Sequence, residues 1–253
     1  MTLAGALATR IQICGPLVIE RGGHRLEARL PGRQGRLAFA YLVTRRDRPV
    51  SRDELAEALW PDDPPPRVDA VLNPLLSKLR GALGGESLES RSTVRLNLPG
   101  AWVDLEAAGE AVHRAESSVA QGDWVRAWGP SQVALFIAER EVLGGEGAPW
   151  IDELRYRLAD VRVRALECYA AAELGVGGAE LAGAVRAGRQ LVRLAPLRES
   201  GYCYLMEALA AEGNVAEALH VYGALCDTLG DQLGIAPGPR ARDLYDQLLS
   251  ASG

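Results

Sequence analysis

Hydrophobic and polar residues alternate with a short period near the start of the chain. In the run HRLEARL, residues 24–30, every second residue is apolar, which is the pattern of a half-buried strand. A glycine pair at 22–23 predicts a turn before this run, and the proline–glycine pair at 31–32 ends it. Residues 11–30 as a whole therefore predict short strands and a small N-terminal sheet.

Helical patterns follow the strands. The segment GRQGRLAFAYLVTRR, residues 32–46, is apolar on most faces and predicts a buried helix. In SRDELAEALWP, Ser51 and Glu54 form a capping box at the start of a second helix, which Pro61 ends. After a proline-rich link, VLNPLLSKLRGALGG predicts a third helix. Its leucines fall on one face, which we expect to lie in the core: Leu72, Leu75, Leu76, Leu79 and Leu83.

A hairpin pattern closes this part of the chain. Between Leu88 and Leu98, apolar residues alternate with polar ones, and ESRST supplies the tip. The predicted order is strands, two helices, a loop, a third helix and a hairpin. This is the layout of a winged helix-turn-helix with an N-terminal sheet.

From residue 104 onward the patterns are helical. Alanine-rich segments alternate with breakers at residues 122–123, 144–147, 175–178, 196, 213–214 and 237–239. Two segments resemble each other, with equivalent glutamates, Glu180 and Glu217, 37 residues apart, which predicts tetratricopeptide-like helix pairs. We therefore expect a mainly α protein: a winged helix-turn-helix (α+β) over 1–103 and an all-α tetratricopeptide-like domain over 104–253.

The charge changes at the same boundary. Residues 1–103 carry 15 Lys and Arg against 11 Asp and Glu, whereas residues 104–253 carry 13 against 22, and the whole chain has a net charge of −5. A mildly basic domain joined to an acidic one is typical of a small nucleic-acid-binding module with a separate helical module. Ordinary surface charge would also account for so modest an excess.

The outer face of the third helix is the candidate surface for DNA. Small residues lie at its centre, where they allow close approach to a phosphate-lined groove: Ala70, Pro74, Ser77 and Gly81. Arg67 and Lys78, the only lysine of the chain, flank this centre on one side, and Asn73 and Arg80 on the other. A base-reading helix more often has Arg, Asn or Gln at its centre, so base reading, phosphate contact alone and a helix without any ligand all stay open.

Specific stretches of the chain resemble a known family. GRQGRLAFAYLVTRRDRPVSRDELAEALWPDDPP and LLSKLRGALG are similar to the winged-helix domain of the Streptomyces antibiotic regulatory proteins. APWIDELRYRL, LRESGYCYLMEALAAEGNVAEAL and LGIAPGPRARDLYDQLL are similar to the bacterial transcriptional activation domain of that family. The resemblance implies an activator that binds direct repeats near the −35 region of a promoter and recruits RNA polymerase holoenzyme.

The same resemblance implies how double-stranded DNA would be bound. The third helix would enter the major groove, and the hairpin would be a wing at the minor groove. Together with Arg67 at the helix edge, the implied contacts are Asn73, Ser77, Lys78, Arg80, Arg91 and Arg95. This chain has Asn73-Pro74-Leu75 where family members often have Arg, Thr or Ser, and Tyr or His, so the implied base specificity is left open.

Catalytic and cofactor signals are weak. The chain has three histidines, and two of them, His113 and His220, fall in helical patterns. The one lysine is followed by Leu79, which excludes a phosphate-loop motif. The cysteines lack metal-ligand spacing: Cys14, Cys168, Cys203 and Cys226. We therefore expect a protein that is not an enzyme and that has no cofactor or metal. We also expect it in the cytoplasm, since no apolar run approaches the roughly 20 residues of a membrane span.

Two functions remain open from the sequence. In the first, the winged helix holds a promoter while the helical domain forms a homodimer or contacts RNA polymerase. In the second, the helical domain is a sensor or adaptor that binds a small-molecule effector or a protein, and DNA binding is weak or ligand-gated. Trp124, Trp128 and Trp150 fit either core anchors or interface hot spots.

Overall fold

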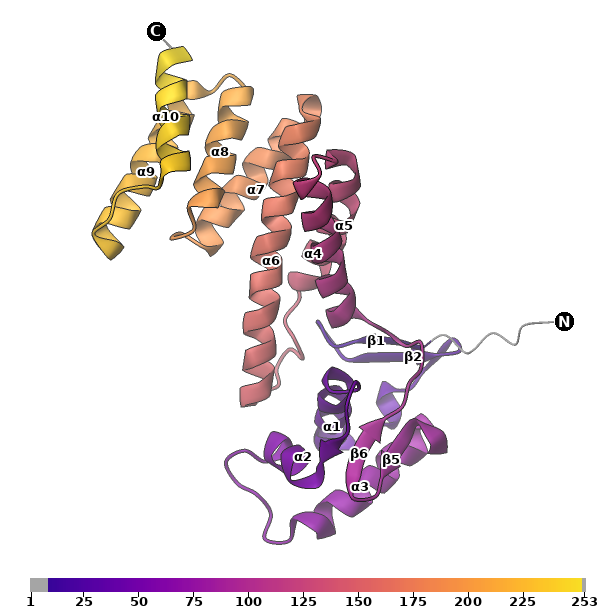
Figure 1. Ribbon diagram of the computed structural model, residues 1–253. Coiled ribbons are helices and arrows are strands. Elements are labelled where there is room, and N and C mark those ends of the chain that lie inside the picture. Colours follow the sequence, from indigo (N-terminus) through magenta and orange to yellow (C-terminus); the bar gives the residue numbers. More distant parts are fainter. Residues whose placement is uncertain (1–8, 252–253) are drawn as a thin grey trace, which may run out of the picture. The chain divides into compact units, whose positions relative to one another are not determined.

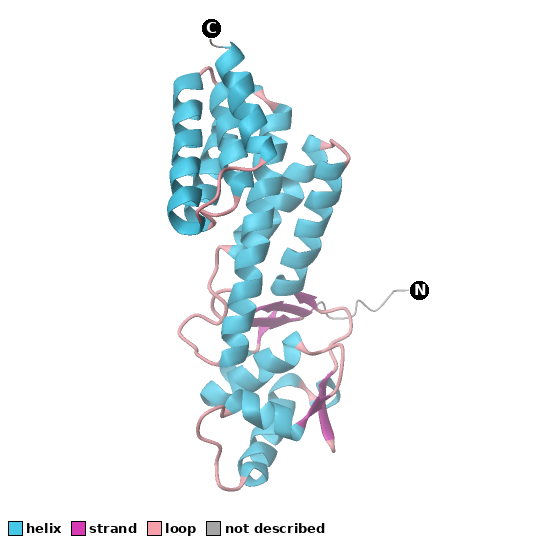
Figure 2. Ribbon diagram, turned by 60° about the vertical axis from the view of Figure 1, so that its left-hand side comes forward, coloured by secondary structure: helices cyan, strands magenta, loops and turns pink. Residues whose placement is uncertain are grey.

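The computed structural model describes residues 9–251 of the chain. The chain forms two compact units, each of which draws on two stretches of sequence (Figure 1). The first comprises residues up to Ala107 together with Arg140–Arg157, and the second comprises Ala108–Glu139 together with the residues from Leu158 onward. Among the described residues, all strands belong to the first unit, and the second is helical (Figure 2).

Two small sheets lie in the first unit. One has the order β3-β2-β1-β7, with strands His24–Arg25, Val18–Arg21, Thr9–Gln12 and Trp102–Val103. The other has the order β4-β6-β5, with strands Val50–Ser51, Thr93–Leu96 and Leu88–Ser90. β5 and β6 are the predicted hairpin, and the ladder that joins β6 to β4 ties this hairpin to the start of the second helix.

The predicted strand over residues 24–30 is wrong beyond Arg25. Glu27–Arg29 instead form a short 3-10 helix, η1, in which Ala28 is exposed. The Leu26 backbone N–H donates to the Ile19 carbonyl (2.8 Å), and the Glu27 carboxylate accepts from the Ile19 N–H (3.1 Å). These bonds turn the chain back on β2. The two buried leucines, Leu26 and Leu30, are four residues apart, a spacing that fits a helical turn as well as a strand.

The three predicted helices of the first unit are confirmed as α1 Gly32–Thr44, α2 Arg52–Leu59 and α3 Val68–Leu83. The Ser51 hydroxyl caps α2 by accepting from the Glu54 N–H at 3.0 Å. On the leucine face of α3, Leu75 is only half-buried. The other four leucines are buried: Leu72, Leu76, Leu79 and Leu83. The helix continues through Pro74 and ends where Gly84 takes a positive φ of 92°.

The segment Arg140–Arg157 packs within the first unit. Trp150 is buried, donates its indole N–H to the Ala58 carbonyl (3.1 Å), and meets the Tyr41 ring edge-on at 5.2 Å between centroids. At the other end, the Leu143 N–H donates to the Ile13 carbonyl at 2.9 Å. Trp150 is therefore a core anchor of the first unit. The predicted domain boundary between residues 103 and 104 stays a prediction about functional modules, because packing divides the chain differently.

Asp104 fixes the junction between β7 and the next helix. Its fully buried carboxylate accepts hydrogen bonds from the backbone N–H groups of Ile13 (3.0 Å), Cys14 (3.0 Å) and Leu105 (2.8 Å). Burial raises the pKa of Asp104, while these three donors act in the opposite direction. The carboxylate thereby joins the end of β1 to the start of the next helix, α4 Asp104–Ala120.

The remaining helices follow the predicted pattern, with every predicted breaker at a helix boundary or between helices. They are α4 Asp104–Ala120, α5 Trp124–Ala138, α6 Pro149–Val176, α7 Leu181–Leu194, α8 Glu199–Ala211, α9 Val215–Leu233 and α10 Pro239–Ala251. In the second unit α7 packs on α8 and α8 on α9, as expected for stacked helix pairs. Gly188 permits the close approach of α7 and α8, since a Cβ there would lie 2.8 Å from Leu205 Cβ.

Candidate nucleic-acid interface

The outer face of α3 carries mostly small and polar side chains, as predicted, with one large apolar side chain, Val71 (44% exposed), beside them. Opposite the buried leucines, the exposed residues of its two middle turns are Asn73, Pro74, Ser77, Lys78 and Gly81. A Cβ at Gly81 would meet nothing within 4 Å, so the end of this face is open. The face has the size and polarity that close approach to a phosphate backbone requires.

Four predicted contact residues carry exposed positive charges without an ion-pair partner in residues 9–251. They are Arg67 at the N-cap of α3, Lys78 on its second half, Arg91 at the hairpin tip and Arg95 on β6. Most other arginines of the first unit are paired, as Arg33 is with Glu146 and Arg48 with Glu54. Arg10 on β1 and Arg29 in η1 are also exposed without an ion pair in residues 9–251, so α3 and the wing carry four of the unpaired cations of the first unit and not all of them.

Arg80 is engaged inside the unit. Its half-buried guanidinium donates from Nε to the Leu88 carbonyl (3.1 Å) and from Nη2 to the Ser90 hydroxyl. Both acceptors belong to β5, so Arg80 holds the wing against α3. Its predicted contact with DNA stays a prediction, and this geometry gives it a positioning role first.

Asn73 is also held by a neighbour that the sequence did not reveal. Arg52, the first residue of α2, donates from Nη2 to the Asn73 side-chain oxygen (2.5 Å) and to Asp69 Oδ1 (2.9 Å). Arg52 Nε donates to the same Asp69 oxygen at 3.1 Å. The Arg52 side chain is only 21% exposed, so it acts mainly on these two residues of α3. No local sequence signal joins α2 to α3 in this way.

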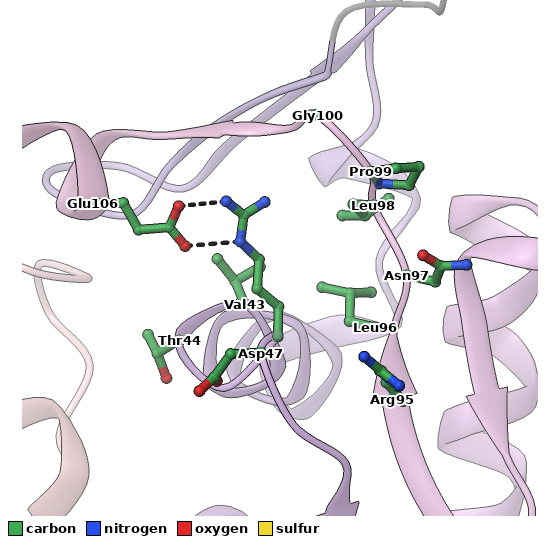
Figure 3. A pocket seen from close by; sticks show the side chains of 11 residues that line it. Val43, Thr44, Asp47, Arg95, Leu96, Asn97, Leu98, Pro99, Gly100 and Glu106 are labelled. Atoms are coloured by element: carbon green, nitrogen blue, oxygen red, sulfur yellow. Dashed lines mark hydrogen bonds and ion pairs between the residues drawn. The ribbon is translucent and has the colours of Figure 1, made fainter.

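A cavity of about 600 Å³ lies beside the wing, between the end of α1 and the chain that leaves β6. Arg46 crosses it to the Glu106 carboxylate with two hydrogen bonds, one of 2.7 Å, and donates to the Ala101 carbonyl at 3.0 Å. Arg95 and Asn97 lie on its opposite wall (Figure 3). Because Glu106 neutralises Arg46, the pair fixes the segment after the wing and leaves Arg95 as the cation facing solvent.

The second unit offers little reactive chemistry. His113 and His220 are exposed on α4 and α9, and no three His, Cys, Asp or Glu residues within 9–251 come together as a metal site. Burial raises the pKa of the Cys168 thiol to about 12 and also raises that of Cys203. The thiols are therefore poor nucleophiles at neutral pH. No helix of the described range is long and apolar enough to cross a bilayer.

The tryptophans of the second unit differ in environment. Trp128 is 42% exposed, and its indole N–H donates to the buried Glu173 carboxylate at 2.7 Å. Trp124 is half-buried, with its ring against Gly175, where a Cβ would lie 2.3 Å from the indole. Trp124 thus packs within the unit, whereas Trp128 also presents apolar surface to solvent.

Comparison with known proteins places these features in context. The model of the bacterial transcriptional activator domain family matches residues 103–249. The regulatory protein AfsR is 32% identical in Streptomyces griseus over 98% of this chain and 25% of its own length, and 34% identical in Streptomyces coelicolor over 96% and 24%. A structure of Mycobacterium tuberculosis EmbR in complex with a low-affinity phosphopeptide aligns with a TM-score of 0.84 and 26% identity, covering 97% of this chain and 65% of EmbR. The chain thus spans about a quarter of AfsR and about two-thirds of EmbR.

Proposed function

The chain belongs to the bacterial transcriptional activator domain family, as its resemblance to the Streptomyces antibiotic regulatory proteins predicted, and from this premise we propose that it is a DNA-binding activator of transcription. The winged helix-turn-helix holds promoter DNA, and the helical unit contacts a protein partner. AfsR and EmbR are both regulatory proteins by name, which supports this general role.

One observation carries the proposed DNA contact. Cations without an ion-pair partner in residues 9–251 lie on both parts of a winged helix that touch a duplex, the third helix and the wing. In this proposal Arg67 and Lys78 meet phosphates beside α3, and Arg91 and Arg95 meet phosphates or the minor groove. Ser77, on the exposed face between them, can donate to a phosphate oxygen. Arg80 supports this arrangement by holding the wing.

The proposed protein contact rests on the exposed surface of the helical unit. One side of α5 presents large apolar residues to solvent: Val125 (78% exposed), Phe136 (65%), Val133 (46%) and Trp128 (42%). Apolar residues gathered on one helix face are typical of protein interfaces. RNA polymerase or a second copy of this chain is the proposed partner of the unit.

The DNA contact is tested by equilibrium binding across a salt series. The probes are a duplex from the protein's own upstream promoter and a random duplex of the same length. We expect log K to fall linearly with log salt, and Lys78→Ala to make the slope shallower by about 0.9, the value for one phosphate contact on duplex DNA. The matched control is Arg193→Ala, which removes one exposed charge from α7 in the second unit and should leave the slope unchanged.

Two results would contradict the proposal. Equal slopes for the wild type and the Lys78 variant would remove α3 from the phosphate contact. Absence of binding to either duplex at low salt would reject DNA binding by this chain and shift the weight to the adaptor function, in which a ligand or protein occupies the helical unit.

A further inference from the structure

Arg52 sets what Asn73 can offer to a ligand. A guanidinium carries only donors, so the Asn73 atom that lies 2.5 Å from Arg52 Nη2 must be the side-chain oxygen. The amide is planar, so its NH2 group points away from Arg52. Asn73 is exposed and its NH2 makes no hydrogen bond within residues 9–251. The oxygen keeps one further lone pair, but the group of the amide that faces away from Arg52 is the NH2 donor.

Asp69 keeps Arg52 in this position. It lies one helical turn before Asn73 on the same side of α3, and its Oδ1 accepts from Arg52 Nε and Nη2 at 3.1 and 2.9 Å. The guanidinium thus joins two side chains that lie one turn apart on α3, with three hydrogen bonds. A group held in several directions resists rotation, so the Asn73 amide is fixed before any ligand arrives.

On this basis we propose that Arg52 is a specificity-determining residue, which makes Asn73 read guanine through its NH2 group. The inference rests on the proposed function, in which α3 lies in the major groove. An unconstrained asparagine pairs with adenine, because it accepts from adenine N6 and donates to N7. With its oxygen already accepting from Arg52 and its NH2 group facing away, Asn73 presents a donor first, and guanine presents two adjacent acceptors, N7 and O6, in the major groove.

Selection from a pool of random duplexes, sequenced after binding to the full chain, tests the inference. The wild type should enrich guanine at one position, with about tenfold weaker binding when that base is changed. Asn73→Ala should lose this preference and keep the others. Arg52→Ala should convert guanine to adenine at the same position, because the freed amide can then present both of its groups.

Asn73→Asp supplies a second variant that does not depend on losing Arg52. Its carboxylate still accepts from Arg52 but offers only acceptors outward, so cytosine, with its N4 donor, should replace guanine on that strand. Thermal unfolding followed by circular dichroism checks that each variant is folded. Asp47→Asn, a change at an exposed position outside α3, is the matched control and should leave every preference unchanged.

The outcomes separate this inference from the proposed function. If the wild type binds duplexes without a guanine preference, or if Asn73→Ala changes no position, Asn73 does not read a base while DNA binding stands. If Arg52→Ala erases a preference that Asn73→Ala leaves intact, Arg52 itself is the reader and the inference is overturned. If the wild type retains no duplex at low salt, the proposed function fails with it.

Discussion

Replacing Asp104 by asparagine should destabilise the first unit strongly although the two side chains have the same shape. Asp104 Oδ1 accepts from Ile13 and Leu105, and Oδ2 accepts from Cys14. Asparagine has one oxygen, so one of its orientations sets an NH2 group against the Cys14 N–H, and the other sets it against the N–H groups of Ile13 and Leu105. At least one buried donor then faces another donor.

The size of the effect follows from these contacts. Losing a hydrogen bond to a charged acceptor costs about 1.5–3 kcal/mol, and leaving a buried donor unsatisfied costs about 1–3 kcal/mol. Burial raises the pKa of Asp104, which means that burying the charge is itself unfavourable, and the neutral amide recovers part of that cost. We expect a net loss of about 2–4 kcal/mol in the free energy of unfolding.

Urea unfolding at neutral pH, followed by far-ultraviolet circular dichroism, measures this loss. Asp47→Asn provides the control, because the same chemical change at an exposed position should alter stability by less than about 0.5 kcal/mol. If Asp104→Asn unfolds within that margin of the wild type, the three backbone hydrogen bonds do not contribute as argued, and the junction must be held by apolar packing alone.

Two further predictions concern the packing of α1 and α2. The hydrogen bonds from Arg48 lower the pKa of Glu54 to about 2 from 4.5, with a further contribution from the Tyr41 hydroxyl, against the effect of burial. The stability that this carboxylate adds is therefore complete above pH 4.5 and is lost as pH falls toward 2. Glu54→Gln should cost about 1–2 kcal/mol in the free energy of unfolding at neutral pH and should make that free energy depend less on pH between 4.5 and 2. An unchanged pH dependence in this window would contradict the argument. Trp150→Ala should lower the free energy of unfolding by about 3–5 kcal/mol in the same urea assay, since it empties a buried site and leaves the Ala58 carbonyl without its donor; a loss below about 1 kcal/mol would mean that residues 140–157 pack only loosely.

The sequence predicted those parts of the fold that depend on local periodicity. The leucine spacing of α3, the Ser51 cap of α2 and the alternation in the hairpin each follow from neighbours within a few residues. The same reasoning misassigned residues 26–30, because buried leucines four apart satisfy both a strand and a tight helical turn. Only the hydrogen bonds to Ile19, in another strand, decide between them.

The candidate site was predictable as a set of exposed cations, but its internal geometry was not. Lys78, Arg91 and Arg95 are exposed, as the pattern indicated. Arg80 bonds a backbone carbonyl of the wing, and a carbonyl carries no side-chain signal that a sequence could show. Arg52 reaches Asn73 across 21 residues, through the angle at which α2 and α3 pack, which no local pattern encodes.

The insertion of residues 108–139 into the sequence of the first unit has a consequence for synthesis. A nascent chain emerges from its N-terminus, so α1, α2 and the wing are available before Trp150 has been made. Tyr41 and the Ala58 carbonyl receive their partner only after α4 and α5 have left the ribosome. The first unit can therefore complete its packing only after part of the second unit has been synthesised. A graft of the winged helix onto another helical module must include residues 140–157.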